Sequence, residues 1–382
     1  MINLKFIFAT ACFICPPNGQ AEARSTGLQL DSVRPLIVVL LLAVAVPAQN
    51  RFAPGTQPFI AVNAPVVALT HVRVIDGTGA APVENQTVVI DHGKIAAVGS
   101  AASVTVPSGA QTLDFTGHTV IPGMVGMHEH LFYPSGGGIP MYNEMAFSFP
   151  RLYLASGITT ARTAGSLEPY TDLNVKRLVD TGQMPGPRLF ITGPYLEGQG
   201  SFAAQMHELD GPADAVRTVD YWAAEGVTSF KAYMDITHAE LQAAVDEAHK
   251  LGIKVTGHLC SIGFREAAAI GIDNLEHGLL VDTEFHPGKQ PDQCPAQGVT
   301  RAEMGRLDIA SPPLREMIAD LVKHHVAITS TLSVFEAFDG SRPPLEARFL
   351  DVASPEAAVS YLSARARARG GEASASIAQM HK

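Results

Sequence analysis

Short apolar segments alternate with longer amphipathic segments from Val120 onward, and this alternation limits the possible folds more than any other feature. Alternating strands and helices are typical of parallel βαβ units. Seven such strand segments after a β-rich start favour a TIM-type (β/α) barrel, although strand number alone also allows an open parallel sheet. We predict strands at 119–127, 158–162, 188–192, 229–233, 254–257, 274–276 and 326–330.

The clearest of the intervening helices is expected at 238–251. Thr237 and Glu240 have the spacing of a capping box at its start, and Gly252 is suited to end it. These signals together predict an amphipathic helix between two of the strands, with an apolar face formed by Leu241, Ala244, Val245 and Ala248.

Residues 66–113 contain short β-type segments separated by Gly, Pro and Asn. Apolar and polar residues alternate in them, as expected of a half-buried strand. The tetrapeptide Asp-His-Gly-Lys at 91–94 is predicted to be a tight turn between two strands. We therefore expect a small antiparallel sheet that precedes the main domain.

The composition allows a large buried core and argues against a nucleic-acid-binding protein. The chain has 382 residues, of which 46% are hydrophobic and 17% charged, so a barrel with an appendage can bury a large core. The formal net charge of −10 argues against a nucleic-acid partner, because no basic stripe is present to neutralise phosphates.

The four cysteines do not define a disulfide framework. Cys12 and Cys15 form a C-x-x-C pair, but no βαβ unit surrounds them, so a redox motif is not expected. Cys260 lies two residues after His258, near enough to line a site there. We predict instead that Cys260 is a small buried hydrophobic residue.

The N-terminal segment 1–48 has the features of a targeting sequence. Residues 36–46 read LIVVLLLAVAV, follow Arg34, and lead into Val-Pro-Ala at 46–48. This order of charge, short apolar run and small residues predicts a secretory signal, with a buried segment or an anchor as the alternative. We therefore expect a protein exported to the periplasm or the medium, with no stable membrane span after the signal is removed.

A signal that begins some thirty residues into a chain is unusual. One hypothesis is that translation starts near Val33 and that 1–32 result from a misassigned start. Mass spectrometry of the N-terminal peptide tests this, and recovery of peptides from the first thirty residues would contradict it.

Two histidines end the first predicted barrel strand. His128 and His130 are two residues apart, so on a strand their side chains point the same way and can bind one metal ion. An H-x-H pair by itself is weak evidence. This pair follows Pro-Gly and ends an apolar strand, at the C-terminal face of the barrel, where TIM-barrel enzymes place their active sites. That position strengthens the evidence for metal binding.

Lys231, His258 and His277 also lie at the ends of predicted strands. Each alone is explained more readily by an ordinary core or surface side chain than by metal binding. A barrel brings successive strand ends around one axis, however, so five such residues together predict a shared metal site.

Lys231 is the unusual member of this group. A buried ammonium is costly unless it is paired or modified. A lysine that loses its proton can react with carbon dioxide to form a carbamate, which carries a negative charge and can bridge two metals. The simpler alternative is a lysine whose charged end reaches solvent at the strand end.

The motifs that carry these residues resemble the amidohydrolase superfamily over about 66–336. The similarity is greatest to its imidazolonepropionase-like and Xaa-Pro (Xaa-Arg) dipeptidase-like branch. It rests on VRVIDGTG, DHGKIAAVG, VIPGMVGMHEH, SFKAYM, DEAHKLGIKVTGH and IDNLEHG, in that order.

The resemblance implies a distorted (β/α)8 barrel at 119–362 and a small β-sandwich portion at 64–118. By the same resemblance, His128 and His130 would bind one metal, carboxylated Lys231 would bridge, and His258 and His277 would bind the second. The cofactors would be two divalent metal ions, with zinc the first choice.

The mechanism implied by the resemblance is attack of a metal-activated water on an amide, cyclic amide or dipeptide. The implied partner is a small-molecule amide or dipeptide substrate. Tyr233, two residues after the lysine, could hydrogen-bond the substrate carbonyl, as in related dipeptidases; an ordinary packing aromatic is the alternative.

The C-terminal part departs from the family pattern. The family's proton-shuttling aspartate follows an eighth strand, but Asp339 lies in a turn-like sequence and Asp351 in a loop or helix start. Residues 363–382 resemble a charged helix or tail. We therefore expect a C-terminally truncated chain that lacks the eighth strand.

Two functions remain open at this point: an exported metal-dependent amidohydrolase, and a catalytically inactive metal- or ligand-binding remnant of one. The five ligand residues favour the first and the missing aspartate favours the second. The substrate cannot be identified, because the loops at 131–150 and 279–315 have no chemical signature. A homo-oligomer is also left open.

Overall fold

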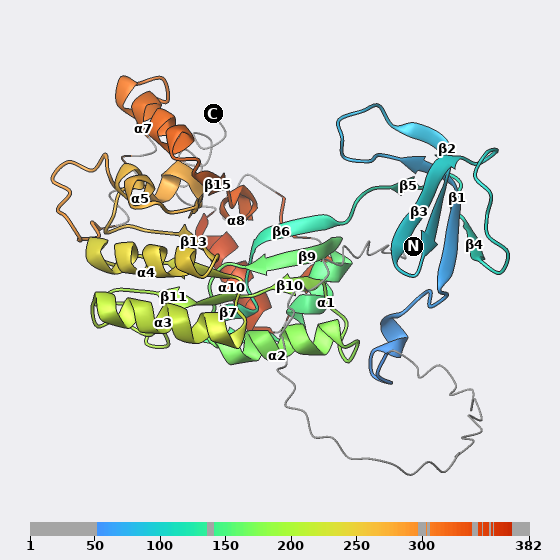
Figure 1. Cartoon of the computed structure of the whole chain (residues 1–382), viewed down its shortest axis with the longest axis horizontal. Coiled ribbons are helices and arrows are strands. Elements are labelled where there is room, and N and C mark those ends of the chain that lie inside the picture. The colour runs from blue at the N-terminus through green and yellow to red at the C-terminus, as the bar shows by residue number, and fades with distance from the viewer. Residues whose placement is uncertain are drawn as a thin grey trace, which may run out of the picture. The chain divides into compact units, whose positions relative to one another are not determined.

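The computed structural model describes residues 52–135, 141–296, 303, 306–337, 343–345, 347–350, 353 and 355–368, which form two compact units divided at Gly123 and Met124 (Figure 1). The predicted targeting segment, with Cys12 and Cys15, lies outside these residues. So do Asp339 and Asp351.

The first unit contains a mixed sheet in the order β3-β2-β1-β4, with β5 also paired to β1. Its strands are β1 (Val66–Val74), β2 (Val83–Asp91), β3 (Lys94–Ser100), β4 (Gln111–Asp114) and β5 (Thr119–Val120), and a short 3-10 helix, η1 (Gln57–Phe59), precedes them. The expectation of an antiparallel sheet is correct for β1, β2 and β3 but wrong for β4 and β5, which run parallel to β1.

The predicted turn at 91–94 is confirmed. Asp91 pairs with Lys94 across the β2–β3 hairpin. His92 and Gly93, between them, both have positive φ, at 47° and 77°. Positive φ at both central residues matches the right-handed twist of the flanking strands, which explains why Gly follows His92.

The strand predicted at 119–127 is two strands in the structure. Its first part is β5, which belongs to the first unit, and its second part is β6 (Met124–Glu129), which belongs to the second. Pro122 separates them. Proline has no N–H for the strand ladder, so the chain leaves one sheet there and enters the other.

The second unit is built on parallel strands. β10 (Arg188–Phe190), β9 (Ile158–Thr163) and β6 form one run, and β11 to β15 form another. The second run consists of β11 (Thr192–Leu196), β12 (Ser229–Ala232), β13 (Lys254–Gly257), β14 (Asn274–Glu276) and β15 (Ala327–Thr329). The strand predicted at 188–192 is thus divided, because Ile191 separates a strand that pairs with β9 from one that pairs with β12.

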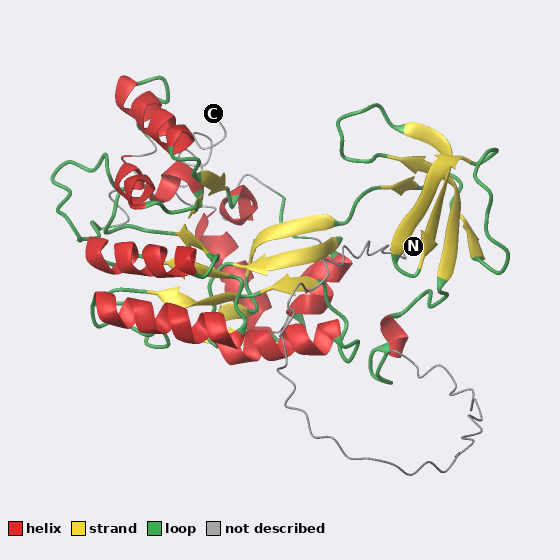
Figure 2. Cartoon of the chain, viewed as in Figure 1, coloured by secondary structure: helices red, strands yellow, loops and turns green. Residues whose placement is uncertain are grey.

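Helices cover these strands, as Figure 2 shows. Figure 1 shows α3 and α4 side by side along the strands, and α4 begins with the predicted capping box of Thr237 and Glu240. A hairpin of β7 (Phe132–Ser135) and β8 (Met141–Glu144) follows β6. The helices are α1 (Phe149–Ala155), α2 (Pro169–Asp180), α3 (Pro212–Glu225), α4 (His238–Lys250), α5 (Phe264–Ile270), α7 (Pro312–Lys323), α8 (Leu332–Ala337), α9 (Ala347–Leu350) and α10 (Pro355–Ala368), with the 3-10 helix η2 (Gly278–Val281).

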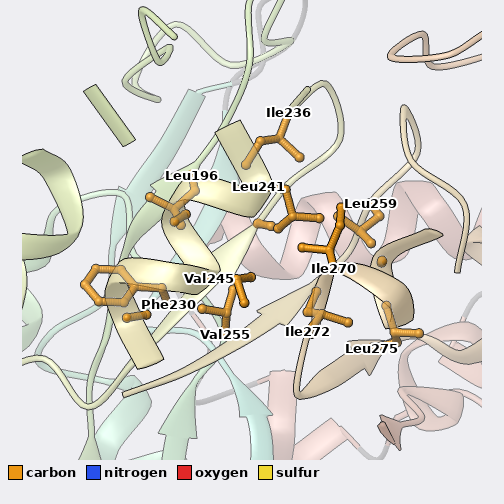
Figure 3. Packing of buried hydrophobic residues seen from close by; sticks show 14 of the residues in the cluster. Leu196, Phe230, Ile236, Leu241, Val245, Val255, Leu259, Ile270, Ile272 and Leu275 are labelled. Carbon is orange, nitrogen blue, oxygen red and sulfur yellow. The ribbon is translucent and has the colours of Figure 1, made fainter. Parts of the chain in front are cut away.

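The core of the second unit lies between the strands and this helical layer. Phe230 and Val255 from the strands face Leu241 and Val245 of α4, and all four are buried (Figure 3). Burial of side chains of this size contributes about 1.5–3 kcal/mol each. This packing holds the C-terminal ends of neighbouring strands in fixed positions relative to one another.

The parallel strands do not close into a barrel within the described residues. There, β6 pairs with β9 alone and β15 with β14 alone, and the described segments after β15 are helices or short connections. One of them, α10, runs across position 363, where the charged tail was expected to begin. None of the helices in the described part is long and apolar enough to span a bilayer.

Candidate active site

The five predicted metal ligands lie at the C-terminal ends of parallel strands. His128 is the second-last residue of β6, His130 directly follows that strand, and Lys231 is in β12. His258 follows β13 and His277 follows β14. Parallel strands direct these ends to the same edge of the fold, so residues more than a hundred positions apart can meet there.

The four imidazole rings form a continuous group. The ring centroids of His128 and His130 are 5.2 Å apart, those of His128 and His277 are 4.7 Å apart, and those of His258 and His277 are 4.6 Å apart. Lys231 joins the group through its Nζ, which lies 3.4 Å from Nε2 of His128. The structure therefore brings together all five residues singled out from the sequence.

An irregularity in β6 helps to aim the two histidines of the H-x-H pair. Gly126 pairs with Ala161 and Glu129 with Thr163, so an extra residue of β6 lies between these two pairs. Bulges of this kind re-aim side chains next to functional sites. The hydroxyl of Tyr153 in α1 then holds the backbone of His130, donating to its carbonyl and accepting from its N–H.

The backbone near the other two histidines is also unusual. His277 has φ 67°, and Leu259, next to His258, has φ 60°. Left-handed backbone is costly for side-chain-bearing residues and persists where surrounding contacts impose it, often at functional sites. Around His277 those contacts include a hydrogen bond from its N–H to Thr329 and one between Nδ1 and the Thr331 hydroxyl at 2.8 Å.

Lys231 is fully enclosed, with 1% of its surface exposed. Burial lowers the pKa of its ammonium to about 7, even though the carboxylate of Glu276 acts in the opposite direction. Half or so of the amine is then neutral near pH 7, which is the form that can react with carbon dioxide. The alternative of a lysine whose charged end reaches solvent is wrong, because the side chain is buried.

The histidines are kept neutral by the same surroundings. Burial, reinforced by the charge of Lys231, lowers the pKa of His128 to about 4 and holds the pKa values of His130 and His277 well below the usual range. A neutral imidazole has a lone pair on one nitrogen, which is the form that binds metal ions.

A carboxylate missed by the sequence analysis lies beneath these rings. Glu276 is completely buried, and its Oε2 accepts a hydrogen bond from Nδ1 of His128 at 2.7 Å. Its Oε1 accepts one from Arg162 at 2.6 Å. Burial alone would raise the pKa of Glu276, but the hydrogen bond from His128 and the nearby cations hold it well below the usual range. The signal in the sequence was a charged residue at the end of a predicted strand, directly before His277.

Tyr233, the predicted substrate-binding residue, is half-buried beside the histidines. Its ring centroid is 5.0 Å from that of His258 and 4.6 Å from that of Tyr195. Lys231 Nζ lies 5.8 Å from the ring of Tyr233 and 5.6 Å from that of Tyr195. Both tyrosines thus border the site, and Tyr195 was not anticipated from the sequence.

Cys260 forms a disulfide with Cys294. The prediction that Cys260 is simply a small buried hydrophobic residue is therefore wrong, although its side chain is buried. The bond ties the residue two positions after His258 to the long connection that follows β14. Sequence spacing alone did not indicate the pairing, because the two cysteines are separated by 34 positions and only the fold brings them together.

The donor set fits divalent metal ions, although the rings are not arranged as a finished metal site. Within the described residues, no group of three or more His, Cys, Asp or Glu side chains has a metal-binding arrangement. Neutral imidazoles and a lysine able to become a carbamate are nevertheless suitable ligands. Nδ1 of His130 is buried and makes no hydrogen bond of normal geometry in the described part of the chain, as expected of a nitrogen available to a ligand.

The barrel region matches a known protein family. The family described as Amidohydrolase family matches residues 119–289, which contain all five of these residues and Tyr233. The search of curated proteins found no relative of this chain.

Several solved structures share the fold. A bottromycin amidohydrolase has a TM-score of 0.57 and 19% identity, with 85% of this chain and 65% of that chain covered. A Xaa-Pro dipeptidase with bound methionine in its active site has a TM-score of 0.54 and 18% identity, covering 80% and 75%. A prolidase complexed with N-methylphosphonate-L-proline has a TM-score of 0.51 and 20% identity, covering 82% and 76%. At these identities the likeness establishes the mixed α/β fold of amidohydrolase structures.

Proposed function

We propose that this chain, whose residues 119–289 match the amidohydrolase family, is a metal-dependent hydrolase that breaks a carbon–nitrogen bond in an amide, a cyclic amide or a dipeptide. The observation that carries this proposal is the meeting of His128, His130, Lys231, His258 and His277 at the ends of parallel strands. Burying four imidazoles and a lysine costs free energy, so the packing of a core alone does not account for this cluster.

Each ligand residue has a distinct task in this proposal. His128 and His130 would hold one ion, and His258 and His277 the other. The neutral amine of Lys231 would attack carbon dioxide and lose a proton, and the resulting carbamate would carry the negative charge that holds both ions together. When bound, two divalent cations, with zinc our first choice, supply a nucleophilic water at neutral pH and polarise the substrate carbonyl.

Tyr233 is suited to orient the substrate. Its ring lies against those of Tyr195 and His258, and its hydroxyl is a candidate donor to the carbonyl oxygen that becomes more negative during attack. The small amide or dipeptide would thus lie between Tyr233 and the histidine group.

Export to the periplasm or the medium is part of the same proposal. The disulfide between Cys260 and Cys294 supports it, because such bonds persist in oxidising compartments and are rare in reducing ones. Fractionation of cells that express the full chain tests this, and recovery only from the cytosol would contradict it.

The function is tested with the full chain purified after expression with added zinc and bicarbonate. Hydrolysis of a panel of Xaa-Pro and other dipeptides is measured beside metal content. We expect turnover near the enzyme median of about 10 per second on the best substrate. A chelator should abolish it.

The control is Lys231→Met, which keeps an apolar stem and removes the amine. It should lose both bound metal and turnover, and a signal from a ¹³C-labelled carbamate should be present in the wild type and absent in this variant. Turnover that survives chelation or this substitution would overturn the proposal. Stable metal binding without turnover would instead support the alternative of an inactive metal-binding protein.

A further inference from the structure

Glu276 connects the histidine group to several strands at once. Its carboxylate is fully buried and accepts hydrogen bonds from His128 in β6, Arg162 in β9 and Thr256 in β13. The distances are 2.7, 2.6 and 2.6 Å. Asn274, on the same strand as Glu276, adds a contact of 3.1 Å. Both oxygens therefore accept hydrogen bonds. Oε2 accepts from His128, whereas Oε1 accepts from the other three donors.

This division determines which nitrogen of His128 carries the proton. The carboxylate of Glu276 is ion-paired with Arg162, and an ionised carboxylate can only accept hydrogen bonds, so Nδ1 of His128 is the donor to Oε2. In a neutral imidazole the other nitrogen then has the lone pair. That nitrogen, Nε2, is the atom that lies 3.4 Å from Nζ of Lys231.

Arg162 keeps this arrangement in place from two directions. Its Nη2 donates to Glu276, and its Nε donates to the carbonyl of Met127 at 2.9 Å. Met127 directly precedes His128 in the irregular part of β6. The same guanidinium therefore fixes the acceptor of the His128 proton and the backbone from which His128 projects.

We propose that Glu276 is a positioning residue that holds His128 in the Nδ1–H form, so that Nε2 is presented beside Lys231 as a metal-binding atom. The assignment rests on the metal site of the proposed function, and it adds a residue that binds no metal itself. Hydrogen-bonded carboxylates behind a metal-binding histidine fix its ring orientation and its tautomer. The competing explanation is that Glu276 and Arg162 only brace the strands.

Glu276→Gln separates these explanations. Oε1 of Glu276 faces three donors, from Arg162, Thr256 and Asn274. In the variant these donors would select the amide oxygen for that position, which places the amide NH2 beside His128. Nδ1 would then have to accept, which forces the proton onto Nε2. We expect the variant to bind zinc or cobalt at least about tenfold more weakly in a competition assay with a chelator.

Two matched controls accompany this variant. Thr256→Val removes a donor to Glu276 but leaves its bond to His128, and should change metal affinity by less than about threefold. Glu197→Gln alters another fully buried glutamate, whose carboxylate accepts from the N–H groups of Gly198 and Asp235, and should leave metal affinity unchanged. Thermal unfolding of all three variants reports any structural cost separately.

The tautomer is measured without metal. Long-range ¹H–¹⁵N spectra of histidine-labelled, metal-free protein, with the His128 signals identified from His128→Gln, should show Nδ1–H in the wild type and Nε2–H in Glu276→Gln. A wild-type His128 with the proton on Nε2 would overturn the proposal even if no variant folds. Equal metal affinity in wild type and Glu276→Gln, or an equal loss in Thr256→Val, would also overturn it. Failure of the wild type to bind metal would refute the proposed function, while these spectra would still decide the role of Glu276.

Discussion

At the scale of single residues, burial explains the chemistry of the site. Lys231 was singled out in the sequence as the unusual member of the group, and its enclosure in β12 lowers its pKa to about 7. The same enclosure lowers the pKa values of His128, His130 and His277 and so favours their neutral forms. The neutral imidazole is the form that binds metal ions.

Substitution of Tyr233 tests whether it does more than pack. Tyr233→Phe keeps the ring contacts with Tyr195 and His258 and removes the hydroxyl. If the hydroxyl stabilises the carbonyl oxygen during attack, kcat should fall by about 10²–10³. Thermal stability and metal content should match the wild type, and steady-state kinetics against the best dipeptide are the measurement. An unchanged kcat would assign Tyr233 a packing role.

Sequence reasoning singled out the five candidate ligands and missed the residues that contact them. His128 and His130 were found from their spacing, and Lys231, His258 and His277 from their positions at strand ends. Arg162 and Glu276 are 114 positions apart in the chain, so no local pattern connects them. Their relation to His128 exists only after the strands are aligned.

At the scale of elements, local sequence signals correctly predicted a helix start and a tight turn. The capping box of α4 and the hairpin between β2 and β3 need only adjacent residues, and both are present as expected. The strand predicted at 119–127 was wrong as a single element. Pro122 marked the break, but only the pairing of β5 with β1 revealed that its two halves serve different sheets.

A test at this scale concerns Asp273, which precedes β14 and ties it to two neighbouring elements. Its carboxylate accepts hydrogen bonds from Lys254 at 2.7 Å, His249 at 2.9 Å and the N–H of Val255 at 2.9 Å. Burial alone would raise the pKa of Asp273, but these donors outweigh it and lower the pKa.

The sign of the pH dependence follows from this lowered pKa. Below the ordinary aspartate pKa of about 3.9, the unfolded chain takes up a proton before the folded one does, so stability is lost as pH falls. Asp273→Asn should therefore unfold more easily than wild type at pH 7 in urea. The difference should disappear as pH falls through the lowered pKa of the folded state. A constant difference down to pH 2 would contradict this explanation.

At the scale of the whole molecule, the disulfide restrains the connection after β14. It joins residues 34 positions apart, and a loop of that length corresponds to between about 3 and 4 kcal/mol of stabilisation in the chain-entropy account. The double variant Cys260→Ala/Cys294→Ala should lose stability of this order in urea unfolding. Wild-type protein unfolded in a strong reductant is the matched control, and it should lose a similar amount. A loss below about 1 kcal/mol in both would mean that the fold holds this connection without the bond.

The sequence by itself indicated the alternation of strands and helices in the second unit, the turn between β2 and β3, the cap of α4 and the five candidate ligands, because these depend on signals within short segments. The tertiary structure decided what depends on segments far apart in the chain. It assigned β5 and β6 to different units, paired Cys260 with Cys294, enclosed Lys231, and placed the carboxylate of Glu276 behind His128. Hydrogen bonds and burial between distant segments have no local pattern, so these features became evident only once the parallel strands were aligned.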